Sequence, residues 1–197
     1  MRTLPVALAV LLLAGCATAP AAEPAPTPTY DGIPVWAGWE PSDTDSELVL
    51  ESDDFTNEGE FPQTIRPGVH CGGPNIRPEL HWSGLPEGTE SVVVTFSYDK
   101  TPENRWIAFD LPTDALLPAS SDAPAEGTLG LTDRSSTDFF GPCAVEGEKF
   151  RLWFTVYALD TTLGLPEGAT FGEVREAGIG HVLAAAQLAG TITGPAA

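Results

Sequence analysis

Positive charge is scarce in this chain of 197 residues. There are 9 lysine and arginine residues against 28 aspartate and glutamate residues, which gives a formal net charge of −19. Only Lys100 and Lys149 are lysines. Phosphate backbones and anionic lipid head groups repel such a surface, which excludes nucleic acid as a partner and flat docking on a membrane. The acidity is typical of a solvated surface.

The sequence also lacks the patterns of a metal site or a catalytic centre. Its 3 histidines, His70, His81 and His181, lie too far apart in sequence to show a metal-ligand spacing. The serine-rich segment 134–137 forms no nucleophile elbow, and Asp99 has no partner acid or base at a usable spacing. We predict no catalytic residue, no metal and no cofactor. His81 and His181 are interpreted as packing residues, whereas His70 either reaches a pocket or lies on the surface.

The N-terminal residues have the pattern of an export signal. Arg2 provides a positive start, and the apolar run from Leu4 to Leu13 is too short to cross a bilayer as a stable helix. The sequence Leu13-Ala14-Gly15-Cys16 resembles a bacterial lipobox. We predict a lipoprotein signal peptide over residues 1–15, a lipid on Cys16, and an extracytoplasmic protein anchored in the cell membrane. A plain secretory signal that contains a cysteine is the alternative.

A proline- and alanine-rich segment follows the signal. Residues 16–45 cannot bury enough apolar surface to fold alone, and we predict that they form an extended tether. Trp36 and Trp39 interrupt this composition; they either touch the lipid interface or pack back onto the domain. The folded domain is predicted to cover residues 46–195.

Residues 46–195 have the pattern of a mainly antiparallel β fold. Short apolar runs separated by Pro and Gly turns indicate strands, of which Arg151–Asp160 is expected to be central and Ala186–Thr193 at an edge. A helix is predicted within Gly168–Leu183. The loop Pro112–Phe140 is long for a compact domain, and such loops are often functional. The predicted strands are Glu47–Ser52, Leu80–Ser83, Ser91–Ser97, Trp106–Leu111, Arg151–Asp160 and Ala186–Thr193.

One stretch, Tyr98 to Pro112, has the pattern of a ligand-binding rim. A polar turn that carries Asp99, Pro102 and Arg105 leads into a strand that begins at Trp106. Two strands joined by such a turn can hold side chains over a cavity. We therefore expect the function of the chain to lie here.

Several motifs, taken in order, resemble the phosphatidylethanolamine-binding protein family. The chain is most similar to the bacterial YbhB/YbcL branch, often called Raf kinase inhibitor-like, over about residues 46–193. The resemblance implies a β-sandwich-like fold with a small anion-binding pocket and one or two helices near the C-terminus. The motifs are Cys71-Gly-Gly-Pro-Asn75, Pro78-Glu-Leu-His-Trp82, Leu85-Pro-Glu-Gly-Thr89, Tyr98-Asp99 with Pro102, Trp106 to Pro112, Gly141-Pro142-Cys143, Arg151 to Asp160, and Gly180-His-Val-Leu-Ala184.

The resemblance also implies a set of ligand-binding residues, although the family pattern is altered here. Asp99 matches an aspartate of the family's pocket, whereas Arg105 replaces a histidine. The family's His-Arg-Tyr run is here Phe150-Arg151-Leu152. Arg105 could hold a phosphate or carboxylate with two hydrogen bonds, or form an ion pair with Asp99 that closes the pocket. The implied ligand-binding residues are Asp99, Arg105, Trp106, Gly141, Pro142 and Arg151.

The cysteines fit the resemblance as well. With Cys16 lipidated, Cys71 and Cys143 remain, and secreted relatives carry cysteines at matching places. A disulfide between them is implied, with two buried free thiols as the alternative.

These expectations lead to two hypotheses of different kinds. The first is a lipid-anchored binding protein that takes a small anionic or phosphorylated ligand and meets the membrane through the lipid on Cys16. The second is an interaction or inhibitor protein with a degenerate pocket, which acts on an unidentified extracytoplasmic partner or protease.

Overall fold

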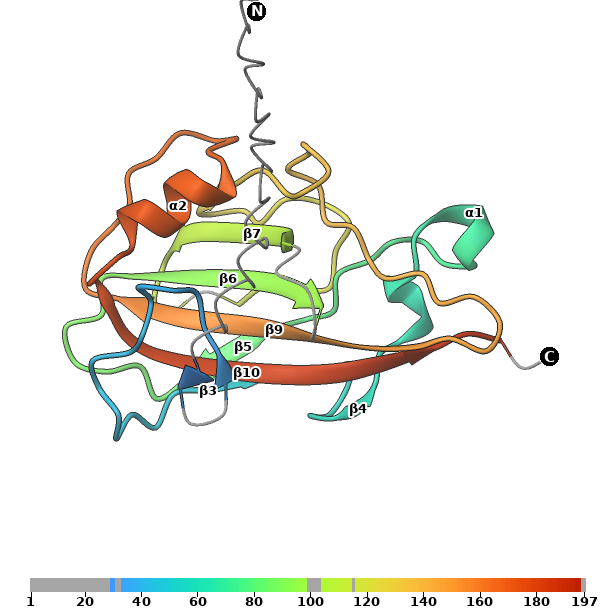
Figure 1. The fold of residues 1–197 in the computed structure, drawn as a ribbon, viewed down its shortest axis with the longest axis horizontal. Coiled ribbons are helices and arrows are strands. Elements are labelled where there is room, and N and C mark those ends of the chain that lie inside the picture. The colour runs from blue at the N-terminus through green and yellow to red at the C-terminus, as the bar shows by residue number, and fades with distance from the viewer. Residues whose placement is uncertain (1–28, 31–32, 99–103, 115, 196–197) are drawn as a thin grey trace, which may run out of the picture.

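The main element of the computed structural model is a six-stranded sheet with the strand order β4-β10-β9-β6-β7-β8 (Figure 1). The structure describes residues 29–30, 33–98, 104–114 and 116–195. All neighbouring strands of this sheet are antiparallel except β10 and β4, which pair in parallel. The strands are β4 Gly59–Glu60, β6 Ser91–Tyr98, β7 Asn104–Leu111, β8 Thr128–Leu129, β9 Lys149–Leu159 and β10 Val182–Thr193.

The predicted central strand is confirmed, since β9 lies between β10 and β6. The strand predicted at the edge, β10, is instead covered at Gly190 and Thr191 by the short β4. The mainly β fold class is confirmed.

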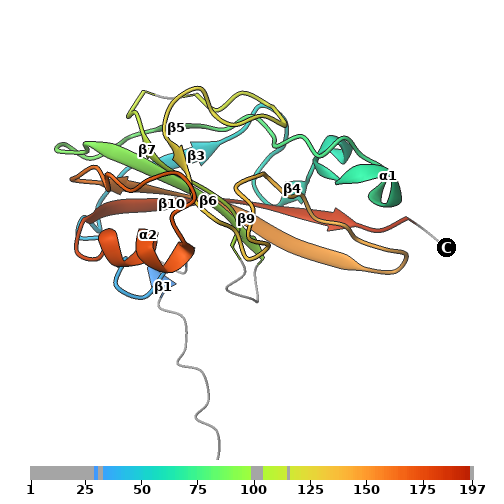
Figure 2. The ribbon, with the colours of Figure 1, turned by 90° about the horizontal axis from the view of Figure 1, so that it is seen from above.

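A smaller sheet lies on one face of the large one, and a helix lies on the other (Figure 2). The small sheet pairs β3 (Val49–Glu51) with β5 (His81–Ser83). Its face contributes Leu50 and the adjacent Leu80 to a core with Val92, Val94 and Phe96 of β6. A separate two-stranded hairpin pairs β1 (Thr29–Tyr30) with β2 (Ile33–Pro34).

The opposite face of the large sheet has its own apolar cluster. There Val174 of the helix α2 (Phe171–Ala177) packs with Val93, Ile107 and Tyr157. Successive side chains of a strand point to opposite faces, so Val92 and Val93 enter different clusters. Residues Ser91 to Phe96 are consequently all buried, including the polar Ser91 and Thr95.

The helices are short. The 3₁₀ helix η1 covers Gln63–Ile65, α1 covers Gly68–Cys71 and α2 covers Phe171–Ala177. Thr170 and Glu173 form a capping box at the start of α2, with Thr170 N donating to Glu173 Oε2 at 2.8 Å. None of the helices in the described ranges is long and apolar enough to cross a membrane.

The predicted helix is thus confirmed only over part of Gly168–Leu183. The helix ends at Gly178, and residues from Val182 onward belong to β10. Gly180 adopts a left-handed φ of 78°, which turns the chain into the strand.

Residues before position 46, which were predicted to form a tether, pack against the folded domain. Val35 and Trp39 are fully buried, and Trp39 Nε1 donates to Arg175 O at 2.7 Å. Trp36 lies against Phe171 with a centroid distance of 4.6 Å. Of the two alternatives for these tryptophans, packing onto the domain is the one observed. Residues between Val35 and Asp45 thus pack against the domain that was predicted to begin at residue 46. Cys16 and the predicted signal peptide lie outside the described residues.

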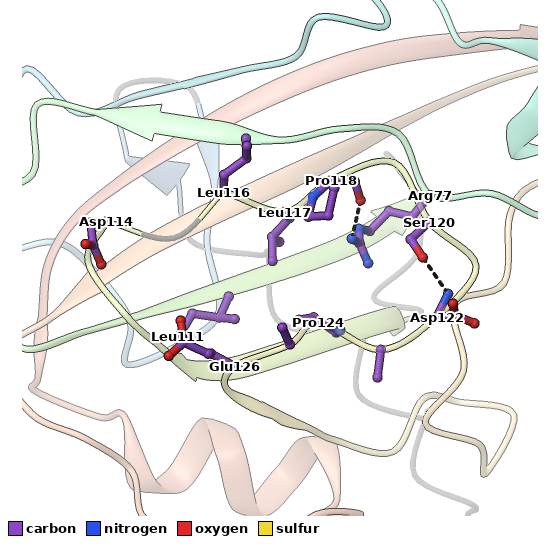
Figure 3. A pocket seen from close by; sticks show the side chains of 12 residues that line it. Arg77, Leu111, Asp114, Leu116, Leu117, Pro118, Ser120, Asp122, Pro124 and Glu126 are labelled. Atoms are coloured by element: carbon purple, nitrogen blue, oxygen red, sulfur yellow. Dashed lines mark hydrogen bonds between the residues drawn. The ribbon is translucent and has the colours of Figure 1, made fainter.

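The long loop after β7 is confirmed and is fastened to the segment before β5. Arg77 and Ser120 exchange two backbone hydrogen bonds of 2.9 and 3.1 Å, and Leu80 and Leu117 exchange two of 2.9 and 3.0 Å. Figure 3 shows this part of the loop beside the β6–β7 pair.

Candidate functional site

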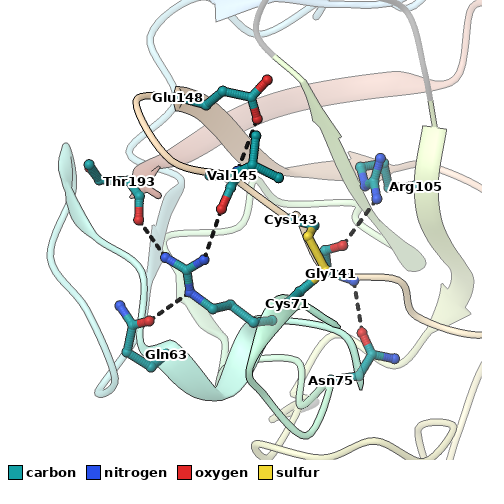
Figure 4. Close-up of a disulfide and its surroundings, with 11 residues drawn as sticks. Gln63, Cys71, Asn75, Arg105, Gly141, Cys143, Val145, Glu148 and Thr193 are labelled. Atoms are coloured by element: carbon teal, nitrogen blue, oxygen red, sulfur yellow. Dashed lines mark hydrogen bonds between the residues drawn. A yellow bond between two sulfur atoms is a disulfide. The ribbon is translucent and has the colours of Figure 1, made fainter. Parts of the chain in front are cut away.

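The centre of the candidate site is the turn Phe140–Gly141–Pro142, which Asn75 holds in place. Asn75 Nδ2 donates to Phe139 O at 2.7 Å. Its Oδ1 accepts from Gly141 N at 2.9 Å (Figure 4). Asn75 has a φ of 62°, a left-handed conformation that asparagine tolerates better than most residues. One side chain thus fixes the backbone on both sides of Phe140.

Gly141 is required by the close approach of another segment. A Cβ at this position would lie 1.7 Å from the carbonyl oxygen of Ile65. No side chain fits there without a backbone shift. The Gly-Pro turn that the resemblance singled out is therefore a packing requirement of this fold.

A disulfide fastens the same turn to α1. Cys71 and Cys143 are joined, with their Cα atoms 5.4 Å apart and a sequence separation of 72. The pairing implied by the resemblance is thus present in the structure. Arg66, a buried residue of the segment before α1, donates to Ala144 O and Thr193 O at 3.4 and 2.5 Å. These links leave the segment from Gly141 to Ala144 little freedom to move.

Arg105 of β7 reaches this turn from the large sheet. Its Nε donates to Phe140 O at 3.1 Å and its Nη2 to Gly141 O at 3.0 Å. The guanidinium also lies 4.8 Å from the ring centre of Tyr98 and 5.2 Å from that of Phe140. A planar guanidinium suits this combination of forked donation and stacking.

An irregularity in the sheet turns Arg105 toward the turn. Phe96 pairs with Trp106 and Ser97 pairs with Asn104, so Arg105 is an extra residue on β7. Arg105 is 8% exposed, and the backbone carbonyls are its described partners. Asp99 lies outside the described residues, so the alternative of an ion pair with Asp99 stays a prediction.

A second arginine, Arg134 of the long loop, stacks on the same ring. Its guanidinium lies 3.8 Å from the ring centre of Phe140. Beside it is a cavity of about 240 Å³. Ser136 donates a hydrogen bond of 2.9 Å to Asp138 at the cavity wall. The residues that line the cavity are Asn75, Ser121, Thr132, Arg134, Ser136, Asp138, Phe139 and Phe140.

Two of the predicted ligand residues, Arg151 and Trp106, do not contact this turn in the ways expected. Arg151 lies on another face of the sheet. Phe150 and Leu152 point into the core shared with Tyr98, so Arg151 between them points to the opposite face of β9. There it pairs with Glu58, with Nε 3.0 Å from Oε2, and it lies 5.1 Å from the Trp153 ring centre. The hydrogen bond from Arg151 lowers the pKa of the Glu58 carboxyl.

Trp106 is a core residue rather than part of a rim. It is 1% exposed, its ring lies 6.2 Å from that of Phe139, and the Arg77 guanidinium lies 4.9 Å from its centre. The structure therefore brings together Arg105, Gly141 and Pro142, with Trp106 in the layer beneath them.

The sequence analysis gave no site role to three residues of the site: Asn75, Arg134 and Phe140. Asn75 closes a glycine-dense turn, a signal of left-handed backbone that could have suggested a fixed turn. Phe140 precedes Gly141 directly. Arg134 had no sequence signal, because it lies in an irregular loop and meets Phe140 only through the fold.

One cluster elsewhere has the composition of a metal site. Asp53, Glu79 and His81 place three candidate ligand atoms within 4.8 Å of one another. Glu79 is engaged on both oxygens, with His81 Nδ1 at 2.9 Å and Asp53 N at 2.8 Å. The hydrogen bond to Glu79 raises the pKa of His81. These internal bonds account for the cluster without a metal ion.

Comparisons with known proteins agree with the fold. The family model described as phosphatidylethanolamine-binding protein matches residues 51–193. A UPF0098 protein from Methanothermobacter thermautotrophicus is 32% identical over 151 residues, which cover 73% of this chain and 97% of that protein. The UPF0098 protein YbhB of Escherichia coli is 33% identical over 135 residues, which cover 62% of this chain and 85% of that protein.

A solved structure has the same architecture. The crystal structure of a putative phosphatidylethanolamine-binding protein homologue from Chlamydia trachomatis superposes with a TM-score of 0.68 at 26% identity, covering 77% of this chain and 100% of that one. The crystal structure of Escherichia coli YbcL gives a TM-score of 0.66 and covers 75% of this chain and 99% of the YbcL chain. At 24% identity this similarity supports the fold alone. Since the family model spans most of the chain and the archaeal relative is matched almost end to end, this chain belongs to the phosphatidylethanolamine-binding protein family.

Proposed function

We propose that this chain is a lipid-anchored, extracytoplasmic binding protein that takes a small anionic group beside Phe140. The observation that carries this proposal is the pair of guanidinium groups, Arg105 and Arg134, that stack on one ring at 5.2 and 3.8 Å. In a chain with only 9 lysine and arginine residues, two of them at one ring create a local positive potential. A cavity of about 240 Å³ adjoins this ring, and its wall carries hydroxyl and amide groups together with the carboxylate of Asp138, which accepts a hydrogen bond from Ser136.

The replacement of histidine by Arg105 changes how such a site responds to pH. A histidine loses its charge near neutral pH, whereas a guanidinium keeps it. The two carbonyl bonds and two stacked rings fix the Arg105 plane before a ligand arrives, which reduces the entropy lost on binding. We expect a weak, small anion such as phosphate or phosphoethanolamine, not an extended polyanion, because the rest of the chain is acidic.

The decisive experiment titrates phosphoethanolamine into the wild type and the Arg134→Met variant by calorimetry. Arg134 is exposed, so its replacement leaves the core intact, and binding should weaken about tenfold if one charge-assisted hydrogen bond is lost. Lys149→Met is the matched control, because it removes an exposed cation elsewhere. Equal affinities for the wild type and Arg134→Met would contradict the site.

The interaction hypothesis has one observation in its favour. Phe150 packs edge-on against Tyr98 at 5.6 Å, so apolar side chains fill space where the family has a histidine. If no anion binds the wild type at several millimolar, this degenerate-pocket alternative replaces the proposal.

The membrane anchor rests on the lipobox-like sequence that ends at Cys16. The Cys71–Cys143 disulfide supports export, since disulfides persist in oxidising compartments and are rare in the cytosol. Labelling of producing cells with a fatty-acid analogue should tag the wild type and spare Cys16→Ser. An equal signal from both would refute the anchor.

A further inference from the structure

A second cavity, of about 400 Å³, lies beneath the segment 116–126 that follows β7. Figure 3 shows Arg77 extending toward Pro118 at one side of it, with Leu111, Leu117 and Pro124 on the other sides. Its volume is in the range of roughly 300–1,000 Å³ that small-molecule sites occupy. The cavity is shaped in advance, because the two backbone bridges between this segment and the chain before β5 hold its wall in place.

The unusual feature of this cavity is the buried cation of Arg77. The residue is 1% exposed, and its Nη2 donates to Pro118 O at 2.8 Å. Within the described part of the chain, its Nε and Nη1 are buried and have no hydrogen-bond partner. Burial lowers the pKa of Arg77 to about 10, so the group still carries its charge at neutral pH. A buried, incompletely paired guanidinium destabilises a fold, and its retention calls for a reason.

The fold itself does not require this guanidinium. The bridge between Arg77 and Ser120 uses backbone atoms only, so another side chain at position 77 would keep it. The stacking on Trp106 at 4.9 Å and the bond to Pro118 use one face and one nitrogen of the group. Two buried donors, Nε and Nη1, remain without a partner in a side chain that lines the cavity.

We propose that this cavity binds a small organic monoanion whose carboxylate accepts a hydrogen bond from Arg77 Nε. The single positive charge of Arg77 complements a single negative charge on the ligand. The leucine and proline side chains of the lining can contact an apolar ligand body. Three carboxylates at the lining, Asp114, Asp122 and Glu126, disfavour phosphate dianions and nucleotides by repulsion. The ligand class is therefore a short alkyl or aryl monocarboxylate.

This site is independent of the one at Phe140. The Arg77 guanidinium lies 4.9 Å from the Trp106 ring centre, and Trp106 itself is buried beneath Phe139, so core side chains stand between Arg77 and the Arg105 turn. The two sites also differ in chemistry. One has an exposed arginine beside hydroxyl groups, and the other has a buried arginine beside leucine, proline and carboxylate side chains.

The test titrates hexanoate into the ¹⁵N-labelled full chain and follows the Nε–H signal of Arg77 by NMR. We expect a saturable shift of this signal, and at least about tenfold weaker binding in Arg77→Met, because one charged hydrogen-bond donor set is lost. Hexan-1-ol, which has the same apolar body without the charge, should also bind about tenfold more weakly. Lys149→Met should bind like the wild type, and Arg134→Met should retain hexanoate binding even where phosphoethanolamine binding is lost.

A second variant keeps the test decisive if Arg77→Met folds poorly. Leu116 lies at the cavity mouth and is 58% exposed, so Leu116→Asp adds an acid there without opening the core. It should weaken hexanoate binding several-fold, with a difference that shrinks in high salt. Unchanged affinity in both variants, an unmoved Arg77 signal in saturating hexanoate, or competitive displacement of hexanoate by inorganic phosphate would each overturn the proposal.

Discussion

Replacement of Asn75 is the most direct test of how the turn at Phe140 is held. In Asn75→Gly the two side-chain bonds, of 2.7 Å to Phe139 O and 2.9 Å from Gly141 N, are lost, while glycine accepts the left-handed backbone. Gly141 is buried, and an unsatisfied buried N–H costs about 1–3 kcal/mol. The lost bond to Phe139 adds about 1 kcal/mol. We expect Asn75→Gly to lower the free energy of unfolding by about 2–4 kcal/mol.

A comparison with Asn75→Ala separates the free-energy cost of the left-handed backbone from that of the lost side-chain hydrogen bonds. Alanine loses the same two bonds and must also adopt a φ of 62°, which adds about 1–2 kcal/mol. Denaturant unfolding of both variants, with the disulfide intact, measures the two contributions. If Asn75→Gly unfolds at the same denaturant concentration as the wild type, the bonds do not hold the turn and our account of the site is wrong.

A destabilised control shows whether binding depends on the turn or on overall stability. Thr170→Ala removes the capping box of α2 and should cost about 0.5–2 kcal/mol on the other face of the sheet. Asn75→Gly should weaken phosphoethanolamine binding, whereas Thr170→Ala should not. Equal losses of affinity in the two variants would mean that binding follows stability alone.

Three further predictions concern the rest of the fold. Removal of the disulfide in Cys71→Ala/Cys143→Ala should cost about 4 kcal/mol by the loop-entropy relation for a separation of 72, measured by denaturant unfolding; a loss under about 1 kcal/mol would contradict this. Trp39→Ala should cost about 3–5 kcal/mol, because its ring is fully buried, and an unchanged unfolding midpoint would restore the later domain boundary. The pKa of His81 is raised in the fold, so its stabilisation is fully present below its unfolded pKa of about 6.5 and is lost as the pH rises through the folded value. The stability difference between wild type and His81→Gln should therefore be larger at acidic than at alkaline pH, and a pH-independent difference would refute the pairing with Glu79.

The strands of the large sheet could be predicted because their apolar residues are continuous and bounded by turns. The predicted strand Arg151–Asp160 coincides with β9 up to Leu159, and Ser91–Ser97 lies within β6. The predicted helix extended too far beyond α2 for a local reason. Gly178 and Gly180 end the helix, and the apolar residues after them are compatible with either a helix or a strand. The alanines that follow carry no strong preference for a strand.

The early start of the domain could not be read from composition. Trp39 is surrounded by prolines and glycines in sequence, and its partners lie far along the chain. A Cβ on Gly178 would be 2.1 Å from Trp39 Cζ2, so the tryptophan fits only because glycine leaves the space. The fit of Trp39 against Gly178 joins residues that are far apart in sequence, so it depends on the tertiary structure and is not visible in the local sequence.

The candidate site was predictable to the extent that its residues belong to motifs. Arg105 and Gly141 were found through the resemblance, and the structure joins them by a hydrogen bond of 3.0 Å. Arg151 was also predicted as a ligand residue from the resemblance, but its two sequence neighbours already indicate that it lies on a different face of the strand. Phe150 and Leu152 are apolar, so strand alternation places Arg151 on the other face.

The distribution of charge between surface and interior ties the two proposed sites together. The buried charged side chains of the described ranges are all arginines, Arg66, Arg77 and Arg105, and each donates to at least one backbone carbonyl. The acidic groups lie outside this interior, so an approaching anion meets repulsion first and attraction only at short range. Screening limits the repulsion to about 8 Å at physiological ionic strength. A small monoanion crosses that distance with one charge, whereas a polyanion is repelled along its whole length. We therefore expect both proposed sites to take small anions in preference to nucleic acids and lipid surfaces.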